Sequence, residues 1–98
     1  MWNNWHIVKF DYQYPVGTDT QSRLVAYEGL EDAQRLFDHL ELGYQFNVPI
    51  RVKGGKMIQV NGVYLYMSFK ENLADAREAV KLGTETLMQE AREIDVDL

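Results

Sequence analysis

The sequence has no cysteine, and this absence removes several kinds of chemistry at once. A disulfide framework, a thiolate metal site and a cysteine nucleophile all need that side chain. Histidine is scarce as well, since His6 and His39 are the only two, and neither has a second ligand at metal-binding spacing or a serine and an acid at triad spacing. We therefore expect no metal, no cofactor and no catalytic centre.

Long apolar runs are also missing. Nothing in the sequence approaches the roughly 20 consecutive apolar residues of a membrane-spanning helix. The first residues, Met1 to His6, have neither the basic region nor the apolar core of a signal peptide. Without a targeting segment or a disulfide, a cytoplasmic location is expected.

Basic residues are outnumbered by acidic ones. Ten Lys and Arg against fifteen Asp and Glu give a net charge of −5, in a chain of 98 residues of which 46% are hydrophobic. This balance argues against a protein whose main task is to grip a phosphate backbone. The length suits one modest core, so we predict a single domain over residues 1–98.

The strongest structural signal lies in residues 50–69, where β-branched and aromatic residues surround two turn signals, Gly54-Gly55 and Asn61-Gly62. Asn-Gly favours a two-residue type I′ turn, so this stretch predicts a three-stranded meander. Alternation then divides the side chains between two faces of the sheet. The core face would carry Ile58, Val60, Val63, Leu65, Met67 and Phe69, and the other face Met57, Gln59, Tyr64 and Tyr66.

The first turn of this meander leaves two registers open. A two-residue loop, Gly54-Gly55, would place Ile50 and Val52 on the tyrosine face. A three-residue loop, Lys53 to Gly55, would place them on the core face, and we prefer it because it puts two apolar side chains in the core.

The flanking segments predict two more strands and two helices. Residues 5–14 and 23–28 alternate in hydropathy and are expected to form an antiparallel hairpin. From Leu30 the apolar period becomes helical, with Gly43 as the expected C-cap. A second helix should begin after Ser68 or Asn72 and continue to about residue 93, with Gly83 either close to a neighbouring backbone or at a break.

The element order is thus β-β-α-β-β-β-α. It predicts an α+β fold in which a single antiparallel sheet of four to five strands carries both helices on one face. A second helix of about 22 residues would be roughly 33 Å long, against about 23 Å for a seven-residue strand. Its overhanging end would expose apolar residues, and we therefore predict a homodimer. These residues are Leu87, Met88, Ala91 and Ile94.

Two groups of residues are candidates for binding another protein. The tyrosine face, with Met57, Tyr64 and Tyr66, is either covered by Trp2 and Trp5, covered by a second subunit, or offered to a partner. The acidic end of the chain has carboxylates where a helix C-terminus would favour cations, and it suits either solubility or a basic partner. These acidic residues are Glu90, Glu93, Asp95 and Asp97.

A third candidate is the basic tip formed by Arg51, Lys53 and Lys56. Lys53-Gly-Gly-Lys56 lacks the rest of a phosphate-loop pattern, and strands rather than a helix flank it. With the tyrosines nearby, the tip is similar to the surface of proteins that bind single-stranded nucleic acid. The net charge makes this class the least favoured, and charges that protect an exposed hairpin are the simpler explanation.

The sequence thus favours a non-enzymatic protein-binding module. In size and composition it is similar to small inhibitors encoded by mobile elements, including inhibitors of host defence systems. Such a protein would act by covering a surface of its target, for example a basic surface that binds nucleic acid. The alternative is a small dimeric α+β enzyme or ligand-binding protein with an aromatic-lined cavity. Its polar groups would be His6, Tyr12, Tyr64 and Tyr66.

Overall fold

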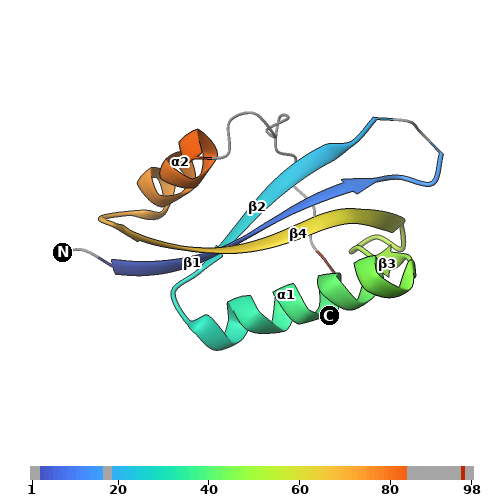
Figure 1. The fold of residues 1–98 in the computed structure, drawn as a ribbon, viewed down its shortest axis with the longest axis horizontal. Helices are drawn as coiled ribbons and strands as arrows, with labels where there is room; N and C mark the ends of the chain where they lie inside the picture. Colours follow the sequence, from blue (N-terminus) through green and yellow to red (C-terminus); the bar gives the residue numbers. More distant parts are fainter. Residues whose placement is uncertain (1–2, 17–18, 84–95, 97–98) are drawn as a thin grey trace.

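A computed structural model describes residues 3–16, 19–83 and 96. These residues form a four-stranded antiparallel sheet with a helix against each face (Figure 1). The elements are β1 (Asn3–Gln13), β2 (Gln21–Tyr27), α1 (Leu30–Phe46), β3 (Ile50–Arg51), β4 (Met57–Lys70) and α2 (Leu73–Gly83). The predicted α+β class and antiparallel sheet are confirmed. Neither described helix is long and apolar enough to cross a membrane.

β1 is the central strand, in the order β2-β1-β4-β3. It pairs with β2 from His6 to Tyr12, which confirms the predicted first hairpin, and with β4 over its whole length. Four consecutive residues of β1, Ile7 to Phe10, are fully buried. Successive side chains of a strand point to opposite faces, so both faces of the sheet must be covered.

The predicted type I′ turn at Asn61-Gly62 is wrong, because β4 runs unbroken through both residues. β1 offers β4 an 11-residue partner, and this ladder satisfies more backbone groups than a hairpin inside residues 57–69 would. Asp11 pairs with Gly62 and Tyr12 with Val60, which leaves Asn61 as the extra residue of a β-bulge. One strand therefore replaces the two that were predicted.

The bulge keeps the two halves of β4 in phase. Ile58 and Val60 before it, and Val63 and Leu65 after it, all pack in the core cluster on the α1 side. A regular strand would turn one of these pairs to the other face. A two-residue turn and a one-residue bulge have the same effect on alternation, so the predicted faces are correct although the predicted topology is not.

The first turn has the register that we preferred. Gly54 and Gly55 have positive φ angles of 94° and 84°, and the Val52 N–H donates to the Lys56 carbonyl at 2.8 Å. Ile50 pairs with Ile58, and both Ile50 and Val52 are buried in the α1-side core. The three-residue loop from Lys53 to Gly55 is therefore confirmed.

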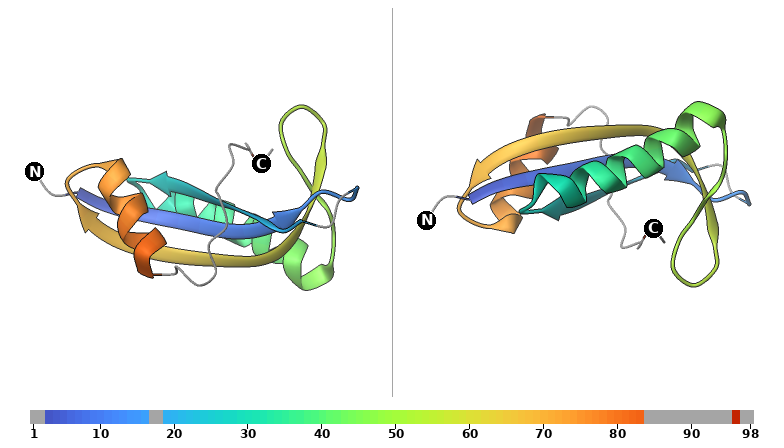
Figure 2. Two further views of the ribbon diagram at one scale, coloured as in Figure 1. Left: turned by 90° about the horizontal axis from the view of Figure 1, so that it is seen from above. Right: turned by 90° about the horizontal axis from the view of Figure 1, so that it is seen from below.

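The two helices lie on opposite faces of the sheet, so the prediction that they share one face is wrong (Figure 2). Ala33, Leu36 and Leu40 of α1 pack in one core cluster. Ala76 and Val80 of α2 pack with Ile7 of β1 and Leu24 of β2 in a second cluster. The reason is that β1 has buried apolar side chains on both of its faces, Val8 and Phe10 on one and Ile7 on the other, so each face needs a cover.

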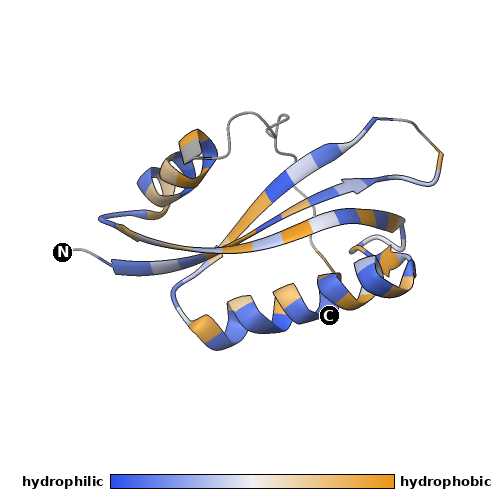
Figure 3. Cartoon of the chain, in the orientation of Figure 1, coloured by the Kyte–Doolittle hydropathy of each residue, from blue (hydrophilic) through white to orange (hydrophobic). Residues whose placement is uncertain are grey.

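α1 continues one turn past the predicted end at Gly43, and Asn47 caps it in the left-handed conformation with φ 54°. Gly43 is buried inside the helix, where a Cβ atom would lie 2.6 Å from Cδ1 of Ile50. Close packing rather than capping therefore explains this glycine. Apolar and polar bands alternate along the helix, as expected when one side faces the core (Figure 3).

α2 begins at one of the two predicted caps. The Asp75 N–H donates to Oδ1 of Asn72 at 3.0 Å, and Nδ2 of Asn72 donates to the Asp75 carboxylate at 3.0 Å. The predicted extension of this helix to residue 93, and the overhang inferred from it, lie outside the described residues. Further on, Val96 forms an isolated antiparallel bridge with Val52.

Two glycine substitutions should separate the observed turn from the predicted one. A Cβ at Gly54 meets no atom within 4 Å, so Gly54→Ala should lose about 1 kcal/mol of unfolding free energy through its positive φ alone. Gly62→Ala puts a Cβ 3.2 Å from the Tyr64 hydroxyl, a flexible group, in a strand where alanine is favoured over glycine. It should change the unfolding free energy by less than about 1 kcal/mol. Urea denaturation measures both, and a larger loss for Gly62→Ala would contradict the unbroken β4.

Candidate functional site

The predicted tyrosine face is the α2 side of the sheet. The rings of Tyr64 and Tyr66 stack with centroids 6.3 Å apart, and Met57 lies half-buried at the start of the same strand. Tyr66 packs against the cluster that contains α2, and Trp5 packs against the same cluster. Burial raises the pKa of the Tyr66 hydroxyl, and the neighbouring Tyr64 and Asp11 raise it further. Tyr66 is half-buried, whereas Tyr64 remains more than one-third exposed.

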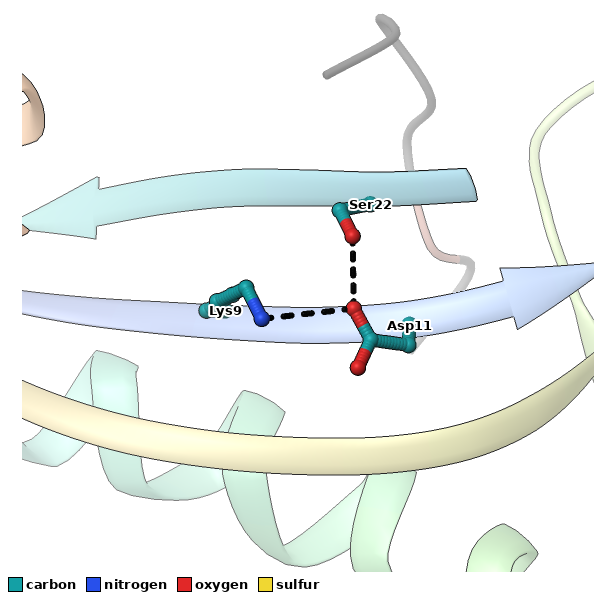
Figure 4. A network of polar contacts seen from close by, with 3 residues as sticks. All are labelled: Lys9, Asp11 and Ser22. Carbon is teal, nitrogen blue, oxygen red and sulfur yellow. Dashed lines mark hydrogen bonds and ion pairs between the residues drawn. The ribbon is translucent and has the colours of Figure 1, made fainter. Parts of the chain in front are cut away.

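Beside Tyr64 lies a buried charged cluster that sequence reasoning missed (Figure 4). The side chain of Lys9 is fully buried, and its Nζ lies 3.4 Å from Oδ1 of Asp11. Ser22 on β2 donates its hydroxyl hydrogen to the same oxygen at 2.6 Å. The Lys9 ammonium also lies 4.9 Å from the centroid of the Tyr64 ring. The cluster therefore joins β2, β1 and β4 through polar contacts.

This arrangement compensates a charge that would otherwise be very costly to bury. An ammonium group away from water needs a counter-ion, and both the Asp11 carboxylate and the face of an aromatic ring supply negative potential. Asp11 keeps contact with solvent, since 17% of its side chain is exposed. The alternation along residues 5–11 already put Lys9 and Asp11 on one side of the strand, but it could not show that Lys9 is buried there.

The side chains proposed for an aromatic-lined cavity do not come together. Tyr12 is buried on the α1 side, and His6 shares that side because it lies an even number of positions from Val8. Tyr64 and Tyr66 are on the α2 side, so the sheet separates the two pairs. Within the described residues, no group of three or more potential metal ligands is found.

The three residues of the basic tip are all exposed on or beside the β3–β4 loop, as predicted. Nζ of Lys56 lies 5.8 Å from the centroid of the Tyr14 ring. Tyr64 is seven positions further along the chain than Met57, which corresponds to about 20 Å of strand. The basic residues and the tyrosines are therefore too far apart to form one short stacking surface for a nucleic acid strand.

The predicted acidic contact residues, Glu90, Glu93, Asp95 and Asp97, lie outside the described residues. A different acidic surface is visible on α1. We call it the acidic–apolar stripe; its members are Asp38, Glu41, Leu42, Gln45 and Phe46. Leu42 is 56% exposed and Phe46 68% exposed, although both are large apolar side chains.

Helix geometry explains how the stripe forms. Asp38, Leu42 and Phe46 are four positions apart, so they follow one another along a single side of α1. Leu42 is two positions after the buried Leu40, which turns it by about 200° away from the core. The sequence prediction ended the helix at Gly43 and treated residues 44–49 as a connection. It therefore had no reason to align Phe46 with Leu42.

The stripe carries uncompensated negative charge. Asp38 accepts a hydrogen bond from Nε2 of Gln34 at 2.8 Å, and Glu41 accepts one from Nε2 of Gln45 at 3.0 Å. Both donors are neutral amides, so neither hydrogen bond brings a positive charge to the stripe. The last turn of α1 has no basic residue, and the negative end of the helix dipole lies there. A shallow hollow of about 280 Å³ opens among Asp38, Glu41, Leu42 and Gln45.

The buried cluster leads to a prediction about stability. Asp11→Asn should cost about 3 kcal/mol of unfolding free energy, because it leaves the Lys9 ammonium buried without a counter-ion. Lys9→Met should cost less, because the Asp11 carboxylate would still accept the hydrogen bond from the Ser22 hydroxyl and would still be in contact with solvent. Urea denaturation of the single and double variants tests this order. Equal costs, or losses that simply add in the double variant, would show that the two charges do not interact.

Similarity to known proteins does not assign the chain to a family. Comparison with protein-family models, with curated proteins and with solved structures finds no match. Function has to be argued from the surfaces described above.

Proposed function

We propose that this chain is a non-enzymatic protein-binding module, an acidic inhibitor or regulator that covers a basic surface of another protein. The observation that carries the proposal is the acidic–apolar stripe on α1. Two large apolar side chains, Leu42 and Phe46, are more than half exposed one turn apart. Exposed apolar groups of this kind, surrounded by polar residues, commonly mark interaction sites.

The charge of the stripe defines the kind of partner. α1 contains four acidic residues and one arginine, Arg35, which lies about two helical turns before Leu42. A complementary surface would present an apolar pocket for Phe46 with Lys or Arg around it. Charges at the edge of such an interface speed association, and the buried aromatic group slows dissociation. Nucleic-acid-binding proteins have basic surfaces of this description, which would make them suitable targets.

Two other parts of the chain agree with this proposal. The net charge of −5 favours encounter with a basic protein at long range. The acidic residues at positions 90, 93, 95 and 97 are also proposed as contacts with a basic partner. Tyr64 keeps an exposed part on the other side of the sheet and is proposed as a second contact, together with Met57 and Tyr66 at lesser exposure.

An affinity experiment with matched variants tests the stripe. The wild type, Leu42→Ser/Phe46→Ser and a control, Val16→Ser, are each used to capture proteins from native lysate for quantitative mass spectrometry. Val16 is 96% exposed and lies in the β1–β2 connection, outside α1, so the control removes an apolar group that is even more exposed than Leu42 or Phe46. Wild type and control should recover the same basic protein. Binding of that protein, once purified, to the stripe variant should weaken about 30-fold, as expected for the loss of an aromatic hot spot.

A charge variant distinguishes a specific interaction through the stripe from nonspecific apolar binding. Asp38→Asn/Glu41→Gln should slow association with the purified partner at low salt, and the difference should shrink as salt rises. Circular dichroism should show all variants folded, because the substituted side chains lie on the outer side of α1. If no captured protein distinguishes the wild type from Leu42→Ser/Phe46→Ser, the proposal is wrong.

A further inference from the structure

We infer that the outer edge of β4 pairs antiparallel with the same edge of a second copy of the chain, so that two four-stranded sheets join into one. This inference does not rest on the stripe that carries the proposed function, although it gives Tyr64 and Tyr66, named above as a second contact, a role between two copies of the chain. It begins with the pairing of β4. In the described part of the chain, β3 pairs with β4 only at Met57 and Ile58, and no strand pairs with the outer side of β4 from Gln59 to Lys70.

The backbone groups on this outer side point away from the sheet. Val52 and Lys56 form a hydrogen-bonded pair, because the Val52 N–H donates to the Lys56 carbonyl. Hydrogen-bonded pairs recur at every second position of an antiparallel ladder, so Ile50 and Ile58 form the next one. The N–H and C=O groups of Ile58 therefore point toward β3. Ile58 lies on the α1 face. Side-chain and backbone directions alternate together along a strand, so the α1-face residues beyond the bulge have their N–H and C=O groups on the open side. These residues are Val63, Leu65, Met67 and Phe69.

Apart from the bulge at Asn61, this edge has none of the usual protection against pairing. Single-chain proteins guard open strand edges with charges, prolines or very short strands. β4 has 14 residues, and its first 13, Met57 to Phe69, include no charged residue and no proline. Beyond the bulge at Asn61, nine regular residues remain, which correspond to about 30 Å of strand. The opposite edge of the sheet, β2, has only seven residues and includes Arg23.

Exposed side chains lie along the same edge. Met67 is 56% exposed and Phe69 is 59% exposed, both on the α1 face. α1 crosses the sheet obliquely, and its end lies near the start of β4, where Nε2 of Gln59 donates to Oδ1 of Asn47 at 2.8 Å (Figure 2). Val63 and Leu65 still pack in the α1-side core, whereas the last residues of β4, with Met67 and Phe69, are left exposed on this face. A strand added at the edge would cover both side chains.

A second copy fits this edge because an antiparallel pair about a two-fold axis is self-complementary. With the axis at Leu65, Val63 of one copy faces Met67 of the other on the α1 side. On the α2 side, Tyr64 of one copy faces Tyr66 of the other and extends the stacked pair seen within the chain. Lys70, the charged end of the strand, lies opposite the part of the partner's β4 near the bulge, where no residue is charged, so no like charges meet. Each copy uses its open β4 edge once, so this pairing joins two copies and leaves no β4 edge for a third.

Light scattering at micromolar concentration is the first test. The wild type should have twice the 11.4 kDa mass of one chain. Met67→Pro removes an N–H on the open side and should give a folded monomer, whereas Met67→Ala keeps that N–H and should remain a dimer. Each chain carries a charge of −5, so the dimer should tighten as salt rises, in contrast to binding through the stripe.

Because the chain has no cysteine, disulfide trapping gives a second test that does not depend on how proline is tolerated. Tyr64→Cys and Tyr66→Cys are prepared separately, mixed under reducing conditions and then oxidised. Opposed residues at such a position are about 4.5 Å apart between Cα atoms, which a disulfide can span. The mixture should form a covalent dimer of one chain of each kind, and either protein alone should form much less.

Two results would overturn the inference. One is a wild-type mass of 11.4 kDa at every concentration, which would leave the edge to a strand of a different protein or to none. The other is a dimer that survives Met67→Pro and does not form the mixed disulfide, which would place the contact on another surface. Neither result affects the capture experiment on the stripe, so the two proposals stand or fall separately.

Discussion

The extra residue at Asn61 is the constraint on which the rest of the sheet depends. β4 must follow β1 along its whole length, and it must also keep its apolar side chains on the α1 face at both ends. The spacing between Val60 and Val63 allows both only if one residue is left out of the pairing. The bulge therefore lets a single strand serve as the main partner of β1, which makes β1 central and forces both faces to be covered.

Several elements of the fold could be predicted because each depends on interactions between residues that are close in the sequence. The alternation in residues 5–14, the loop at Gly54-Gly55 and the cap at Asn72 depend on near neighbours, and all three are confirmed. Asn61-Gly62 was misread because a turn and a bulge have the same effect on alternation, and only the distant β1 decides between them. Likewise, nothing next to Gly43 in the sequence reveals that Ile50 packs against it.

The candidate surfaces were harder to predict than the fold. Tyr64 and Tyr66 were placed on the correct face, but α2 covers part of it, which changes the tyrosines from an open face to a partly internal pair. The stripe depended on where α1 ends, because Phe46 joins Leu42 only in a helix that continues to Asn47. That end of α1 lies near the start of β4, where Gln59 donates to Asn47, so the stripe and the exposed end of β4 at Met67 and Phe69 are different surfaces.

The pairing of β1 with β4 also affects how the chain folds while it is being synthesised. Asn3 pairs with Lys70 and Gln13 with Gln59, so the central strand obtains its principal neighbour late in synthesis. From Gln13 to Lys70 a ribosome adds 70 − 13 = 57 residues, which at about 5–20 residues per second takes roughly 3–11 seconds. During that interval only β2 can pair with β1, and the apolar residues on both of its faces lack their final cover. The nascent protein therefore passes through a period in which the strand that is central in the final sheet is a target for chaperones and for premature association.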